Sequence, residues 1–115
     1  MTAERGGSSA EGPMRREQRF ELRLDVSLRT DAGSYPACLL DLSRAGAMVE
    51  TRLPLLAGAR VTLIAERLEV EARLVWARNG RCGLLFDKEL KATDIFFQVG
   101  RSRDAARAQG PGANR

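Results

Sequence analysis

Apolar and polar residues alternate along most of the middle of the chain, with the period of two that predicts β-strands. From Leu22 to Leu28 every second residue is aliphatic, and the residues between them are charged or carry a hydroxyl. Further strands are predicted over residues 37–40, 47–51, 60–65, 68–76 and 81–86, with Pro36 restricted to the border of the second strand. Asn79-Gly80 favours a tight hairpin because both residues tolerate positive φ, so the last two strands should be antiparallel neighbours.

Beyond the last predicted strand the period changes to helical spacing. Thr93 is predicted as the N-cap and Asp94 lies in the first turn. The apolar stripe consists of Ile95, Phe96 and Val99. We expect a helix over about residues 92–107, with a weak point at Gly100, packed against one mouth of the β structure. Several short strands with close turns predict an all-β barrel or sandwich, and closure into a barrel removes exposed strand edges.

Two kinds of residue in these strands are predicted to lie in the core. The register of the fifth strand that starts at Leu68 also includes Trp76, so core packing is a simpler prediction for Trp76 than stacking on a ligand. Cys38 and Cys82 stand in apolar runs without CxxC spacing, so each is predicted to be a small core residue.

Both ends of the chain have compositions that do not support folding. Residues 1–13 and 108–115 are rich in small and polar residues and have hardly an apolar side chain, so burial cannot offset the entropy of ordering them. We therefore predict a disordered arm and tail around one domain at residues 14–107, with strands over about 20–87.

The composition excludes several classes of function. The chain contains no histidine, the commonest general base and metal ligand, so we expect neither an enzyme nor a metal or cofactor site. No apolar run approaches the roughly 18 residues needed to cross a bilayer. The N-terminal residues lack the apolar segment of a signal peptide. A cytoplasmic protein without membrane insertion is expected.

The positive charge is concentrated at the ends of the chain. The formal net charge is +4, yet residues 24–99 contain ten basic and ten acidic residues. A neutral middle lacks the one-sided basic face of a dedicated nucleic-acid binder. We therefore expect no nucleic-acid partner.

Two short motifs carry polar groups that could bind a ligand. The first is a basic cluster before the first strand, Arg15, Arg16 and Arg19, whose guanidinium groups can capture a phosphate or a guanine edge. The second follows the second strand and contains Asp41, Ser43 and Gly46, where glycine permits positive φ or close approach of a ligand. Taken separately, the arginine cluster is more simply interpreted as a solvated segment, and the second motif as an ordinary turn.

Together the two motifs resemble the PilZ domain family, the bacterial receptors for cyclic di-GMP. The resemblance rests on an RxxxR pair (Arg15, Arg19), a [D/N]xSxxG motif (Asp41, Ser43, Gly46) and a hairpin, LVWARNGRCGLLF. The resemblance extends over about Met14–Val99. The chain is similar to a stand-alone, single-domain member of the family. It implies a six-stranded antiparallel barrel with a C-terminal helix, and a ligand held between the arginine segment and the barrel surface.

The resemblance also implies a role for each matching residue. Arg15 and Arg19 would clamp phosphates and guanine edges, and Arg16 would add charge or stack on a base. Asp41 would accept hydrogen bonds from guanine N–H groups, Ser43 would bond to phosphate or base, and Gly46 would leave room for the purine. Family members often bind an intercalated dimer of the dinucleotide, which Arg16 makes plausible here. Arg44 and Trp76 are peripheral candidates, for which solvent exposure and core packing are the simpler interpretations.

We therefore expect a cyclic di-GMP receptor that orders its arginine segment on binding and then signals to an unidentified partner protein. A monomer or weak dimer is expected. One alternative is a PilZ-like adaptor that acts through protein contacts without nucleotide. A further, weaker alternative is a small barrel that binds single-stranded nucleic acid, for which the six aromatic residues leave little stacking surface.

Overall fold

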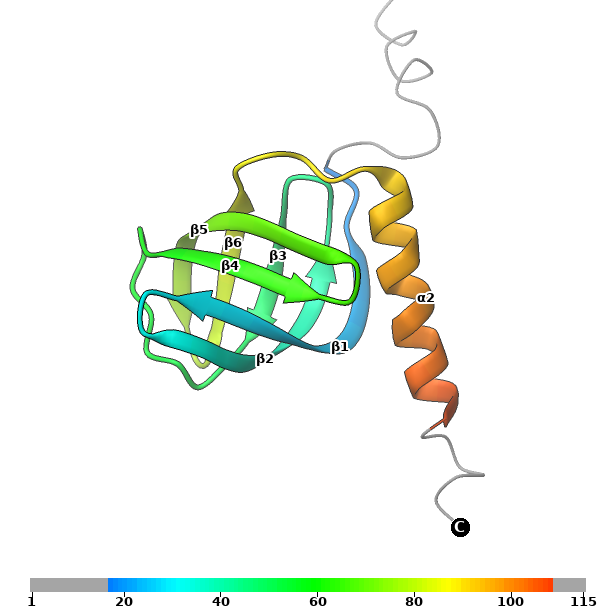
Figure 1. Cartoon of the computed structure of the whole chain (residues 1–115), viewed down its shortest axis with the longest axis horizontal. Helices are drawn as coiled ribbons and strands as arrows, with labels where there is room; N and C mark the ends of the chain where they lie inside the picture. Colours follow the sequence, from blue (N-terminus) through cyan, green and yellow to red (C-terminus); the bar gives the residue numbers. More distant parts are fainter. Residues whose placement is uncertain (1–16, 109–115) are drawn as a thin grey trace, which may run out of the picture.

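The computed structural model describes residues 17–108 as a closed antiparallel barrel of six strands with one helix (Figure 1). The elements are β1 (Phe20–Thr30), β2 (Gly33–Leu42), β3 (Gly46–Glu50), β4 (Arg60–Ala65), β5 (Leu68–Arg78), β6 (Arg81–Phe86) and α2 (Ala92–Ala108). Neighbouring strands pair in the order β1-β2-β3-β6-β5-β4. The predicted barrel is confirmed and the sandwich is excluded. The predicted arm, residues 1–13, and residues 109–115 of the predicted tail lie outside the described residues, whereas Ala108, predicted as the start of the tail, is the last residue of α2.

The two strands of the first hairpin are longer, and the turn between them is shorter, than the sequence pattern predicts. Only Asp31 and Ala32 lie between β1 and β2, because Thr30 already pairs with Gly33. The predicted restriction of Pro36 to a strand border is wrong. Pro36 lies inside β2. β3 pairs with β2 only from Cys38 onward, so at Pro36 the edge of β2 that faces β3 has no backbone hydrogen bonds that a proline would remove.

The β5–β6 hairpin has the predicted geometry. Asn79 and Gly80 both adopt positive φ, 55° and 79°, which is what a two-residue turn between twisted strands requires. The strands therefore pair as antiparallel neighbours, as predicted.

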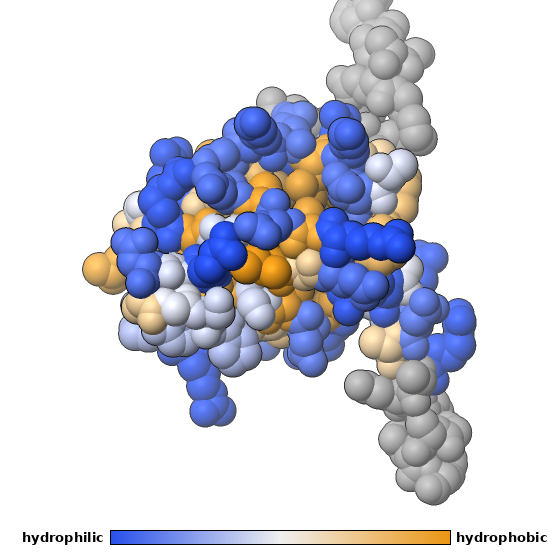
Figure 2. All heavy atoms as spheres, viewed as in Figure 1, coloured by the Kyte–Doolittle hydropathy of each residue, from blue (hydrophilic) through white to orange (hydrophobic). Residues whose placement is uncertain are grey.

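The inward faces of the strands form one apolar core. Its fully buried side chains include Leu28, Leu39, Leu42, Val49, Leu63 and Leu74. In the view of Figure 2, hydrophilic residues cover most of the surface and hydrophobic residues gather near the middle of that face. Cys82 belongs to the core, and its burial raises the pKa of the thiol. The core prediction for Cys38 is wrong, because the inward register of β2 is taken by Ala37 and Leu39, which leaves Cys38 half-buried on the outer face.

Helix α2 lies alongside β1 and covers one opening of the barrel (Figure 1). β1 pairs with β4 only at residues 27–29, so the first half of β1 has no strand partner on its β4 side. Ile95 and Val99 of α2 join the core there. Polar contacts fix the helix: the Ser102 hydroxyl bonds to both the N–H and the C=O of Arg23.

The start of the helix differs from the prediction. The helix begins at Ala92, and the Asp94 carboxylate accepts a hydrogen bond from the Lys91 N–H at 3.2 Å. Asp94 therefore caps the first turn from inside the helix, and the prediction of Thr93 as the N-cap is wrong. The helix continues through Gly100 without a break. Within residues 17–108, no helix is long and apolar enough to cross a membrane.

Candidate functional site

The structure joins the two sequence motifs through one ion pair. Arg19 precedes β1, and Asp41 lies near the end of the neighbouring strand β2. Arg19 donates from Nε to Asp41 Oδ2 at 3.3 Å and from Nη2 to Oδ1 at 3.2 Å. The Arg19 side chain is 59% exposed and the Asp41 side chain is 13% exposed, so the arginine covers the carboxylate. Residues 22 positions apart therefore meet at one place on the barrel surface.

Of the predicted arginine cluster, the structure describes Arg19 alone. Arg15 and Arg16 lie outside the described residues. Their roles in ligand binding stay predictions.

Asp41 faces outward because β2 is irregular just before it. The pairing with β3 shifts between Leu39 and Asp41, which places Leu39 and Leu42 in the core and Asp41 outside. Asp41 is opposite Met48 of β3, which shares the outer face with it. A similar shift in β1 sets Glu21 opposite Asp41. A carboxylate is therefore displayed on the outer wall of the barrel.

Cross-strand pairing continues this row around the barrel. Met48 pairs with Gly83 of β6, and Gly83 pairs with Trp76 of β5. We call the residues Asp41, Met48, Gly83 and Trp76 the outer-face row. Every member belongs to a different strand, so the row depends on the closed sheet and is not visible as a local sequence motif.

The core prediction for Trp76 is wrong. A register shift between Leu74 and Trp76 ends the alternation of β5: Leu74 is fully buried, whereas Val75 and Trp76 are 45% and 38% exposed. A Cβ on Gly83 would lie only 2.1 Å from the indole nitrogen of Trp76. The indole therefore rests directly on the backbone of β6, and the absence of a side chain at Gly83 makes this position possible.

A shallow cavity adjoins the tryptophan end of the outer-face row. It has a volume of about 720 Å³ and is lined by Met48, Glu50, Trp76, Arg78, Asn79 and Arg81. We call it the outer-face cavity. It combines an aromatic face, a thioether and two guanidinium groups, which suits a planar, anionic ligand better than a purely apolar one.

Ser43 and Gly46 build the turn that carries β2 into β3. The Ser43 N–H donates to Gly46 O at 2.9 Å, the Ser43 hydroxyl accepts from the Gly46 N–H at 3.1 Å, and the side chain is buried. Gly46 does not have the positive φ that the sequence allowed. Its hydrogen side faces β6, where a Cβ would lie 2.1 Å from Leu84 O. Both residues have structural tasks, and their predicted contacts with a ligand stay predictions.

Arg44 lies at the tip of the same turn and is held in place. Its Nε donates to Leu90 O at 3.1 Å, and its guanidinium lies 3.7 Å from Glu89. Its side chain is 31% exposed, which does not match the solvated arginine of the simpler interpretation. The contacts tie the turn to the connection between β6 and α2.

The sequence pattern missed Met48, Gly83, Arg78 and Arg81 as neighbours of the candidate site. The alternation of β3 would have placed Met48 outside, beside Asp41. The position of Trp76 could not be inferred, because it depends on the irregular pairing in β5. Among residues 17–107 no three potential metal ligands come together.

Comparison with known proteins identifies the family to which this barrel belongs. A family model described as the PilZ domain matches residues 13–96, which include both motifs and Trp76. The chain therefore belongs to the PilZ domain family. No curated protein matches it.

Two solved structures share the fold. The PlzA protein of Borreliella burgdorferi, solved in complex with c-di-GMP, aligns with a TM-score of 0.58 and 14% identity over 84% of this chain and 44% of that one. The PilZ domain of CeSA from a cellulose synthesizing bacterium aligns with a TM-score of 0.52 and 22% identity over 74% of this chain and 93% of that one. The chain thus spans less than half of the PlzA chain. At these identities the likeness shows the fold.

Proposed function

We propose that this PilZ domain is a receptor for cyclic di-GMP and not an enzyme. The observation that carries the proposal is the Arg19–Asp41 pair, which joins the two family motifs on the same outer wall as Trp76. The structure of PlzA with c-di-GMP supports the choice of ligand. A cytoplasmic location belongs to the same proposal.

The chemistry of the pair suits a guanine nucleotide. The Asp41 carboxylate can accept from the N–H groups on the Watson–Crick edge of guanine, and a guanidinium can donate to O6 and N7 or to a phosphate. An exposed ion pair contributes only about 0–1 kcal/mol to stability, so a ligand that separates Arg19 from Asp41 loses little. The pair therefore holds both groups in place without blocking the ligand.

The rest of the outer-face row can extend the site. Trp76 offers an indole face for stacking on a second base, a contact that contributes about 1–3 kcal/mol in nucleic-acid binding proteins. Arg78 and Arg81 of the outer-face cavity can neutralise phosphate charge. A bound dinucleotide would also draw Arg15 and Arg16 onto this face, and an intercalated dimer of the ligand would use the same surface.

In this proposal, the ordered arginine segment signals to a partner protein. One observation favours the alternative of an adaptor without nucleotide: the Arg19–Asp41 pair already satisfies both side chains within the chain. Loss of the ligand during evolution would leave the same contact as a structural ion pair. Direct titration separates the two functions.

Isothermal titration calorimetry with cyclic di-GMP tests the proposal. We expect a dissociation constant below about 100 μM for the wild-type chain, equivalent to more than roughly 5.5 kcal/mol. Asp41→Ala and Arg19→Ala should each weaken binding at least about tenfold, because each removes charge-assisted hydrogen bonds. Arg103→Ala is the matched control, because Arg103 is an exposed arginine of α2 far along the chain from both motifs.

The same titration can also contradict the receptor proposal or the proposed site. Wild-type affinity weaker than about 100 μM, equivalent to less than roughly 5.5 kcal/mol, would contradict the receptor and favour the adaptor. Normal binding by both variants would contradict the site. The stoichiometry of the titration distinguishes one bound dinucleotide from an intercalated dimer, and gel filtration gives the oligomeric state.

A further inference from the structure

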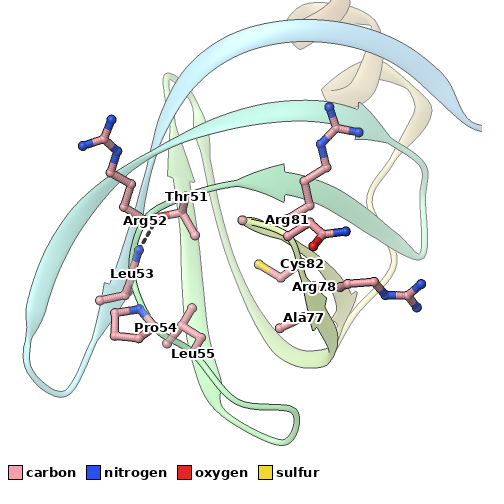
Figure 3. Close-up of a pocket in the computed structure, with 11 residues that line it drawn as sticks. Thr51, Arg52, Leu53, Pro54, Leu55, Ala77, Arg78, Arg81 and Cys82 are labelled. Atoms are coloured by element: carbon pink, nitrogen blue, oxygen red, sulfur yellow. Dashed lines mark hydrogen bonds between the residues drawn. The ribbon is translucent and has the colours of Figure 1, made fainter.

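A second cavity lies between the β3–β4 connection and the β5–β6 hairpin (Figure 3). Its volume is about 440 Å³, within the range of natural ligand sites. The apolar part of the lining, which we call the floor, consists of Leu53, Pro54, Leu55, Ala77 and Cys82. Three arginines complete the lining: Arg52, Arg78 and Arg81. We call this cavity the arginine-rimmed cleft.

The walls of the cleft are fixed by hydrogen bonds. The Thr51 N–H donates to Gly80 O at 2.9 Å, which ties the connection to the hairpin. The Thr51 hydroxyl donates to Pro36 O at 3.1 Å and accepts from the Leu53 N–H at 3.2 Å. The cleft is therefore formed without a ligand, and a ligand would not have to order its walls.

The charge of the cleft is poorly compensated. Arg81 lies 3.9 Å from Glu50, at the outer limit of an ion pair. Arg52 and Arg78 have no carboxylate partner within the part of the chain that the structure describes. In Figure 3 the three guanidinium groups project away from the aliphatic floor. The cleft thus presents an apolar base with a positively charged rim.

The lining favours a peptide over a nucleotide. No aromatic side chain from the described residues lines the cleft, so a base would find no ring to stack on. The same connection carries Leu56, which is 79% exposed. Aliphatic contacts at the centre and arginines at the edge are typical of protein–protein interfaces.

We propose that the arginine-rimmed cleft binds an acidic segment of a partner protein, with an aliphatic side chain of that segment on the floor and its carboxylates on the arginines. Charge complementarity selects this partner over a basic one. Arg78 and Arg81 line both this cleft and the outer-face cavity, so the partner segment would lie beside the proposed nucleotide. Peptide binding itself does not require nucleotide binding.

The test uses fluorescein-labelled synthetic peptides of roughly eight residues, in which two leucines are flanked by Glu and Asp. Anisotropy and ¹H–¹⁵N spectra of the full chain are recorded together. We expect saturable binding below about 1 mM. The amide shifts should centre on Thr51, Leu53, Ala77 and Gly80. A peptide with Lys in place of the acidic residues should bind at least about tenfold more weakly.

Charge reversal locates the contact. The double variant Arg52→Glu with Arg78→Glu should lose at least about tenfold in peptide affinity, because both side chains are exposed and unpaired by carboxylates. Arg73→Glu is the matched control, because Arg73 is an exposed arginine of the same strand as Arg78 but outside the cleft. Asp41→Ala should bind the peptide normally, which separates this inference from the nucleotide proposal.

Three results would overturn the inference: no shift up to about 1 mM peptide, equal binding of the lysine peptide, or unchanged affinity in the double variant. Unchanged circular dichroism of the double variant ensures that a loss of binding reports on the cleft and not on unfolding.

Discussion

Within the motif from Asp41 to Gly46, Asp41 has a different structural role from Ser43 and Gly46. Asp41 lies on the outer face of the barrel, where Arg19 covers its carboxylate, whereas Ser43 and Gly46 are buried in the turn. The turn bonds tie the start of β3 to the end of β2, and this connection sets Asp41 beside Met48. A short family motif can thus consist of one residue that presents a functional group and two that position it.

Trp76 and Gly83 repeat this division on the neighbouring strands. The indole is displayed on the surface, and Gly83 provides the flat backbone beneath it. In both places the glycine permits a close contact, and the larger residue, Asp41 or Trp76, lies on the outer face of the barrel. Substitutions at the structural members should change stability first, and those at the displayed members should change binding first.

Gly46→Ala should have the largest effect. The added Cβ would lie 2.1 Å from the backbone oxygen of Leu84, so β3 and β6 must separate. We expect a loss of about 3 kcal/mol or more in the free energy of unfolding, measured by urea denaturation.

Gly100→Ala is the control for this substitution. A Cβ at Gly100 meets nothing within 4 Å, and the residue lies inside α2. Alanine there should stabilise the protein by roughly 0.5–1 kcal/mol. Equal stability of the two variants would contradict the close contact between β3 and β6.

Gly83→Ala should have an intermediate effect. Its Cβ would collide with the Trp76 indole rather than with backbone, and the indole can rotate away from the surface. We expect a stability loss of about 1–2 kcal/mol and weaker cyclic di-GMP binding by about 1 kcal/mol or more, measured by denaturation and calorimetry. A variant that keeps full affinity would remove Trp76 from the site.

Ser43→Ala should have the smallest effect. It removes the acceptor for the Gly46 N–H, and one such hydrogen bond contributes about 1 kcal/mol. Urea denaturation should show this loss, while calorimetry should show a smaller loss of nucleotide affinity than in Asp41→Ala. The opposite order would mean that Ser43 contacts the ligand and that the turn tolerates its absence.

Much of the barrel followed from the sequence because period-two alternation identifies strands and Asn79-Gly80 identifies one hairpin. Two of the errors fall where strand pairing is irregular or where one edge of a strand is unpaired. Pro36 is tolerated inside β2 because β3 is too short to pair with β2 at that position. Trp76 leaves the core register through a shift that no local pattern reveals.

The candidate site was only partly predictable for the same reason. Arg19 and Asp41 could be chosen by residue type and spacing, and the structure brings them into contact. Met48 and Gly83 join them only through cross-strand register, which depends on the closed order of the whole sheet.

The fluorescence of Trp76 tests the central claim most directly, because it is the only tryptophan in the chain and stands on the outer-face row. Cyclic di-GMP is titrated into the wild-type chain and into Asp41→Ala, with calorimetry under the same conditions. We predict saturable quenching of the wild-type emission with the calorimetric dissociation constant, and quenching of Asp41→Ala only at concentrations at least about tenfold higher. Wild-type binding by calorimetry with unchanged emission, or the same quenching in both chains, would contradict a nucleotide site that joins Asp41 to Trp76.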